Sequence, residues 1–258
     1  MAQSVAVSAR RSTLVLAVLL AVSAAAWGVF VWQARAGQPA AMAKGLTMGM
    51  NPARFLALWT VMMAAMMLPG LAPAALAFAR GAGERRSNSW PGRSTWLFVG
   101  AYLGVWAVTG LFVYLAAVMA DGLADRSAWL MAHGAQLGGV SILLAGAYQL
   151  SAPKRTCLAR CRSAGVSALD SRCNEWRGAM RTGLAYGLAC LGSSGILCVL
   201  LLLPLGMMNL GAMLLLTLII SAEKAMPLGM AASRVTAAAL IACGVLALFV
   251  PAALPTVL

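Results

Sequence analysis

The chain has few charged residues, very few acidic ones and a single histidine. Of its 258 residues only 10% are charged, against about a quarter in a typical soluble domain, and 62% are hydrophobic. A soluble fold of this size could not keep so much apolar surface out of water, and intrinsic disorder requires low hydrophobicity. Both classes are therefore excluded, and the composition predicts an all-α, polytopic transmembrane helix bundle.

Cysteine and histidine are too scarce for several kinds of site. Six cysteines are too few for a disulfide scaffold, and one histidine, His133, excludes a histidine-rich zinc centre. No hydrolase triad, phosphate-binding loop or dinucleotide-binding glycine pattern occurs in its required context. We therefore expect no enzyme activity.

A membrane helix needs about 20 mostly apolar residues. By this criterion the sequence contains about seven apolar runs that could cross a bilayer. The runs cover 13–32, 55–79, 95–119, 128–150, 181–203, 205–222 and 234–252. Only Pro204 separates the fifth run from the sixth. Residues 1–33 form an N-terminal anchor or, alternatively, a cleaved signal segment, which would leave six spans.

The distribution of positive charge predicts the orientation. A net charge of +13 would suggest nucleic acid in a soluble protein, but fifteen of the 19 Lys and Arg residues lie in alternate connections that include the N-terminus. Because cytoplasmic loops carry an excess of basic residues, the N-terminus is predicted inside and 34–54 becomes a Met-containing outer loop. Residues 55–258 form the helical membrane domain, with a basic, Cys-containing inner loop at 151–180. We interpret the basic residues as topology determinants that contact membrane lipid, and expect no nucleic-acid partner.

Methionines are clustered in the second run. Four of them occur within six positions: Met62, Met63, Met66 and Met67. Residues three and four apart are neighbours on a helix, so these thioethers form a stripe of about one and a half turns. Pro69 and Pro73 follow one turn apart and predict a kink below the stripe.

A second methionine cluster lies in the sixth run, and two further methionines lie in the outer loop. These residues are Met207, Met208 and Met213, with Asn209 beside them, and Met48 and Met50. Thioether sulfur is a soft ligand that selects Cu(I), and it persists on the oxidising side, where thiols would not last. The alternative interpretation is that methionine is a flexible apolar filler.

Thiols and ionisable groups complete the candidate site. Cys157 and Cys161 share a helix face among basic residues, which lower a thiol pKa and favour the metal-binding thiolate; the alternative is two incidental cysteines. Glu223 and Lys224 close the sixth run, where an ionisable pair predicts a functional site unless both side chains reach the headgroups. His133 is either an additional copper ligand or a polar residue at the membrane interface.

Several segments, in this order, resemble one bacterial domain of unknown function. They start at Trp59, Tyr148, Gly183, Gly206 and Glu223 and read WTVMMAAMMLP, YQLSAPK, GLAYGLAC, GMMNL and EK. The order resembles a family of predicted metal-binding integral membrane proteins, some members of which are described as copper chaperones. The resemblance covers roughly residues 55–230, and implies a multi-pass protein of the bacterial inner (cytoplasmic) membrane that handles copper.

The fifth run departs from that family. Where the family usually reads Cys-x-Gly-Cys-Cys-Trp, this chain has Cys190 followed by Gly192, Ser193 and Ser194. Hydroxyls are poor ligands for Cu(I), so this departure weakens any metal role of the fifth run. Cys198 does not replace the missing thiols, because it lies eight residues on, about 12 Å along a helix axis.

Together these patterns predict a copper-binding membrane protein that acts as a copper chaperone or staging site. Methionine supplies the ligands, with Cys157, Cys161 and Cys190 as further sulfur donors, and the metal is Cu(I). A copper-donating or copper-receiving protein is the expected partner. Two alternatives stay open: a copper transporter, and a structural or assembly subunit with a degenerate metal site.

Overall fold

The computed structural model describes most of the chain as helix. The described residues are 2–35, 46–47, 49–84, 91–124, 126–129, 133–170, 176–205, 209–226 and 229–249. Within these ranges no residue belongs to a strand, which confirms the predicted all-α class. The elements are α1 (Ala2–Arg35), α2 (Pro52–Glu84), α3 (Pro91–Ala124), α5 (Gly134–Gln149), α6 (Ala152–Asp170), α7 (Trp176–Cys190), η2 (Leu191–Gly195), α8 (Ile196–Leu205), α9 (Leu210–Ala225) and α10 (Gly229–Phe249).

Five helical stretches in the described part are long and apolar enough to cross a membrane. They are Ser12–Gln33, Pro52–Arg80, Arg93–Ala124, Trp176–Leu202 and Gly229–Phe249. The fourth and sixth predicted runs instead form α5 and α9, which have 16 residues each. Such a helix is about 24 Å long, shorter than a hydrocarbon core of about 30 Å. Five of the seven predicted spans therefore correspond to helical stretches of spanning length. The inside location of the N-terminus stays a prediction.

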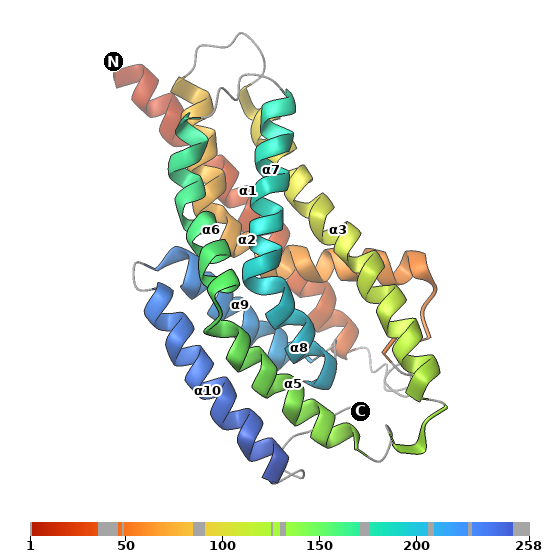
Figure 1. The fold of residues 1–258 in the computed structure, drawn as a ribbon. Helices are drawn as coiled ribbons and strands as arrows, with labels where there is room; N and C mark the ends of the chain where they lie inside the picture. The colour runs from red at the N-terminus through yellow and green to blue at the C-terminus, as the bar shows by residue number, and fades with distance from the viewer. Residues whose placement is uncertain are drawn as a thin grey trace.

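Helix α2 is the centre of the bundle. It packs against α1, α3, α6 and α9, and 67% of its apolar window is buried, against 22% for the windows in α3 and α10. Every residue from Met62 to Leu68 is buried. In Figure 1 the ribbon of α2 changes direction along its length, in agreement with the internal prolines Pro69 and Pro73. The methionine-rich segment is thus enclosed by protein.

The segment predicted as a basic inner loop contains a helix that packs on the bundle. A turn at Leu150 and Ser151 separates α5 from α6, and α6 then runs alongside α2 and α7 (Figure 1). Lys154, Leu158 and Cys161 are buried, at the spacing of one helix face, while Arg155 and Arg160 are exposed. This face brings a lysine and a thiol into the core.

The basic ends of several helices lie at the same end of the molecule. The start of α1, the end of α2, the start of α3 and the facing ends of α6 and α7 gather there (Figure 1). Arg10, Arg80, Arg93, Arg177 and Arg181 belong to these segments. Lys154 and Arg155 lie at the start of α6, and Lys224 and Arg234 belong to α9 and α10, so the group does not contain all of the predicted inner residues and the sidedness stays a prediction.

A π-helical segment, η2, joins α7 to α8. Its residues Ser193, Ser194 and Gly195 are buried, and it packs against α6. π-Helical turns are rare in proteins, and those that do occur often lie at functional sites. The serines that distinguish this chain from the family pattern therefore lie in an irregular, buried turn.

Candidate metal-handling site

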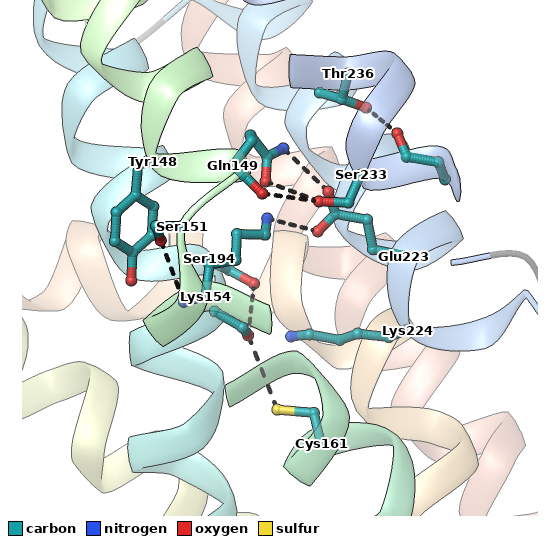
Figure 2. Close-up of polar contacts among 12 residues, drawn as sticks. Tyr148, Gln149, Ser151, Lys154, Cys161, Ser194, Glu223, Lys224, Ser233 and Thr236 are labelled. Carbon is teal, nitrogen blue, oxygen red and sulfur yellow. Dashed lines mark hydrogen bonds and ion pairs between the residues drawn. The ribbon is translucent and has the colours of Figure 1, made fainter. Parts of the chain in front are cut away.

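A buried ion pair lies where α5, α6 and α9 meet. Lys154 Nζ is 2.8 Å from Glu223 Oε2, and the two side chains are 0% and 1% exposed. Gln149 Nε2 donates to the other carboxylate oxygen at 3.0 Å. Figure 2 shows the three side chains pointing toward one another. Both carboxylate oxygens are therefore satisfied inside the protein, and the interpretation in which Glu223 reaches lipid headgroups is wrong.

Two further side chains tie this pair to the neighbouring helices. Arg162 Nη1 donates to the carbonyl oxygens of Glu223 and Met226, at 2.8 and 2.6 Å, at the C-terminal end of α9. Ser233 Oγ on α10 donates to the backbone and side-chain oxygens of Gln149, each at 3.4 Å. The network therefore joins α5, α6, α9 and α10 around one carboxylate.

Lys224 points away from this carboxylate and bonds to sulfur. Its Nζ donates to Cys190 Sγ at 2.9 Å, and the Tyr102 hydroxyl lies 3.2 Å from the same sulfur. The lysine stem crosses α2 at Gly70, where an added Cβ would lie 3.3 Å from Lys224 Cδ. Lys224 is only 8% exposed, so it does not reach headgroups either. A glycine on α2 thus leaves room for a buried lysine to reach a thiol on α7.

Hydroxyls and thiols surround the π-helical turn. Ser193 Oγ donates to the Cys190 carbonyl at 3.0 Å, and lies 3.3 Å from Ser194 Oγ and 3.8 Å from Cys161 Sγ. An added Cβ at Gly192, in the same turn, would lie 2.6 Å from Cys157 Sγ. The three cysteines predicted as donors therefore all lie around η2, although they come from two different helices.

Burial controls the chemistry of the α6 side chains. It raises the pKa of the Cys161 thiol from its ordinary value of 9.0 to about 11, although the Lys224 ammonium opposes the shift. Burial also lowers the pKa of the Lys154 ammonium, against the opposite effect of Glu223. The prediction that nearby cations lower the thiol pKa is therefore wrong for Cys161, because desolvation outweighs the cations.

This shift predicts a pH dependence of stability. Between pH 9 and about 11 the unfolded chain loses the Cys161 proton and the folded protein keeps it. Stability therefore falls as the pH rises through this window. We expect the Cys161→Ser variant to lose less stability there than the wild type, in chemical denaturation at each pH. Cys243→Ser, which alters an exposed thiol, is the control, and equal pH slopes for wild type and Cys161→Ser would contradict the shift.

The described methionines of both clusters are buried. Met62, Met63, Met66, Met67 and Met213 are at most 3% exposed. They belong to one continuous core that also contains Cys161, Cys190 and Cys198. Met50 packs against the edge of this core. The structure thus brings predicted thioether and thiol donors into a single core, and their role as ligands stays a prediction.

The remaining predicted residues have local partners or lie outside the described part. His133 stacks on Trp129, with ring centroids 4.5 Å apart, and its Nδ1 is 2.8 Å from the Trp129 carbonyl. Asn209 caps α9 by accepting from the Ala212 amide at 3.1 Å. Its position is explained by helix capping. Met48, Met207 and Met208 lie outside the described residues.

Histidine, cysteine and carboxylate side chains do not form a metal-binding cluster of their own in the described ranges. No group of three or more His, Cys, Asp and Glu side chains is placed there to hold a metal ion. The soft donors that the described core does gather are thioether and thiol sulfurs. Such a donor set suits Cu(I) and no hard cation.

Long apolar helices around a core of thioether, thiol and ammonium groups form an all-helical bundle whose interior contains several soft sulfur donors. The chain belongs to the copper chaperone family PpoB2, whose model matches residues 56–247. This range contains both the buried cluster and the methionines of α2 and α9. No curated protein and no solved structure matches the chain significantly. The family description indicates copper and suggests a non-catalytic role, and it agrees with the copper chaperones of the family predicted from sequence; the membrane and metal-binding character of that family stays a prediction for this chain.

Sequence reasoning missed three members of the buried cluster. Gln149 and Lys154 belong to the segment YQLSAPK of the family resemblance, but the sequence gives them no role in a site, and it gives Tyr102 none. Lys154, Leu158 and Cys161 follow the helix period, which is a signal that the basic segment has a buried face. No comparable signal marks Tyr102, because it lies among apolar residues of α3.

Proposed function

We propose that this protein is a copper chaperone embedded in the bacterial inner membrane, which holds Cu(I) through sulfur ligands in the bundle core. One observation carries the proposal: the methionines of α2 and α9 share a continuous core with Cys161 and Cys190. Sulfur donors of both kinds are thus concentrated in the interior of a chain whose family carries copper.

The α2 side of this core leads toward the thiols. Met66 and Met67 lie four and three residues before Gly70, so all three share a face of α2. An added Cβ at Gly70 would meet Lys224 Cδ at 3.3 Å and Ile220 Cγ2 at 3.8 Å. The thioethers therefore lie one turn from the point where α9 crosses α2.

The methionine-bearing face of α9 also leads toward the thiols. Met213, Ile220 and Lys224 are separated by seven and four residues and share one face of α9. Lys224 donates to Cys190 Sγ. Ser193 Oγ in η2 donates to the Cys190 carbonyl and lies 3.8 Å from Cys161 Sγ, so Ser193 lies between the two cysteines. Two methionine-bearing faces thus meet along an interface that ends at thiols, and successive sulfur donors support copper transfer by ligand exchange.

The surface of the bundle supports the membrane location. Large apolar side chains are exposed along α3 and α10, including Phe112, Val235 and Phe249. Soluble monomers rarely expose contiguous apolar patches of more than a few hundred Å². Four of the five stretches of spanning length, in α1, α3, α7–α8 and α10, carry exposed large apolar side chains, so lipid is the solvent that suits them.

A copper transporter is the second candidate, and the buried Lys154–Glu223 pair favours it. Ionisable groups inside a membrane bundle commonly mark ion pathways. Passage through the bundle would also use the same sulfur donors. The two candidates therefore differ in where copper goes after binding.

The test is a Cu(I) binding and uptake experiment on the full chain. Purified protein titrated with Cu(I) under reducing conditions, against a coloured Cu(I) chelator, is expected to bind copper and to hand it to a thiol-containing acceptor. Sealed vesicles containing the protein and a trapped chelator are expected to take up no copper. Uptake by the vesicles would establish transport, and a protein that binds no Cu(I) would contradict both candidates.

A further inference from the structure

The contact between Lys224 and Cys190 is unusual for a buried lysine. Its neighbour Glu223 accepts from Lys154 and Gln149 instead, so the hydrogen bond recorded for the Lys224 ammonium is to sulfur. Figure 2 shows Lys224 extending from α9 toward the side where Cys161 and Ser194 lie. A positive charge is thus held in the part of the core where the thiols gather.

An ammonium and a Cu(I) ion compete for the same sulfur. Copper binds through a sulfur lone pair, and an N–H···S hydrogen bond at 2.9 Å occupies a lone pair of Cys190. The two cations also repel each other, strongly so where water is excluded. Copper bound to Cys190 therefore requires the Lys224 ammonium to move off the sulfur.

We propose that Lys224 is an internal competitor for copper, whose ammonium occupies the metal position on Cys190 in the copper-free protein and promotes copper release. The proposal rests on the copper-carrying function proposed above. During release the Cu–S bond to Cys190 breaks, a Cu–S bond to the acceptor thiol forms, the proton of that thiol passes to Cys190, and the N–H···S bond forms again. Lys224 stays protonated and copper stays Cu(I), so no electron has to be supplied.

The movement concerns the ammonium end of the Lys224 side chain. Its stem packs closely against Gly70, where an added Cβ would lie 3.3 Å from Lys224 Cδ, so the displacement is confined to the end of the side chain. Tyr102, 3.2 Å from the sulfur, keeps a second contact with Cys190 when the ammonium leaves. Lys154 is held by Glu223, whereas Lys224 donates to the Cys190 sulfur.

The test measures Cu(I) affinity and release in the purified full chain with a coloured Cu(I) chelator as the competing probe. Lys224→Leu, which offers no donor and no ligand, is expected to bind the same number of Cu(I) ions about tenfold more tightly and to release them correspondingly more slowly. Lys224→Gln, a neutral donor, should shift affinity in the same direction by less. Lys224→Gln also provides the test if the Lys224→Leu variant does not fold.

Two controls assign the effect to the lysine charge and to this sulfur. Tyr102→Phe removes an uncharged contact to the same atom and should change the affinity much less than tenfold. Adding Cys190→Ser to Lys224→Leu should abolish the gain. Unchanged or weaker binding by both Lys224 variants would overturn the role of Lys224 while copper binding by the wild type stands. Absence of Cu(I) from the wild type would overturn the proposed function itself.

Discussion

Replacing Glu223 with alanine is expected to lower the free energy of unfolding by about 3–5 kcal/mol. Lys154 is 0% exposed, and its ammonium would lose the carboxylate oxygen that lies 2.8 Å away. Gln149 would lose its acceptor in the same step. Reversible unfolding in mixed micelles, followed by circular dichroism, measures the loss.

The double variant Lys154→Met/Glu223→Leu separates the cost of an unpaired charge from the cost of lost packing. Replacing a buried ion pair by apolar groups of similar volume is often neutral or stabilising, so most of the loss should be recovered. Arg160→Ala, at an exposed site on α6, is the matched control and should change stability by less than about 0.5 kcal/mol. A Glu223→Ala loss no larger than that of Arg160→Ala would contradict the structural role of the pair.

Replacing the four α2 methionines with leucine is expected to remove most of the bound copper while the protein stays folded. The residues are Met62, Met63, Met66 and Met67, all buried. Leucine nearly conserves volume, so each swap usually costs less than about 1.5 kcal/mol, yet it offers no ligand. Copper per protein after reconstitution under reducing conditions, together with the unfolding curve, gives both quantities.

The chain provides a matched control for this variant. Four methionines of the described residues lie outside the core and are exposed: Met119, Met180, Met226 and Met230. Their joint replacement by leucine should leave the bound copper unchanged. If the α2 variant keeps its copper as fully as this control, the buried methionines are packing residues, and the alternative of a structural or assembly subunit is favoured.

The helical class and the central helix could be predicted from the sequence because long apolar runs have few possible structures. The 16-residue lengths of α5 and α9 could not be predicted, because each apolar run begins before its helix does. A hydropathy pattern does not indicate the residue at which a helix is capped. Helix α6 was missed for the opposite reason. Its mean composition is polar, and only the spacing of Lys154, Leu158 and Cys161 indicates a buried face.

The candidate site was predictable in its parts and not in its assembly. Methionine clusters and paired cysteines are visible in the sequence, and the structure places the α2 methionines, Met213 and Cys161 in one core, with Cys157 beside η2. The bond from Lys224 to Cys190 joins residues 34 positions apart, and the Lys154–Glu223 pair joins residues 69 apart. Such pairings depend on how α6, η2 and α9 pack, which no local pattern specifies.

The X-ray absorption spectrum of the Cu(I)-loaded protein tests most directly whether sulfur in the core holds copper. Wild-type protein loaded under reducing conditions is expected to give a first coordination shell of sulfur alone. The same spectrum should be largely lost in the variant without the four α2 methionines and kept in the exposed-methionine control. A first shell dominated by nitrogen or oxygen, or a sulfur shell unchanged in the α2 variant, would contradict the assignment of copper to these core sulfurs.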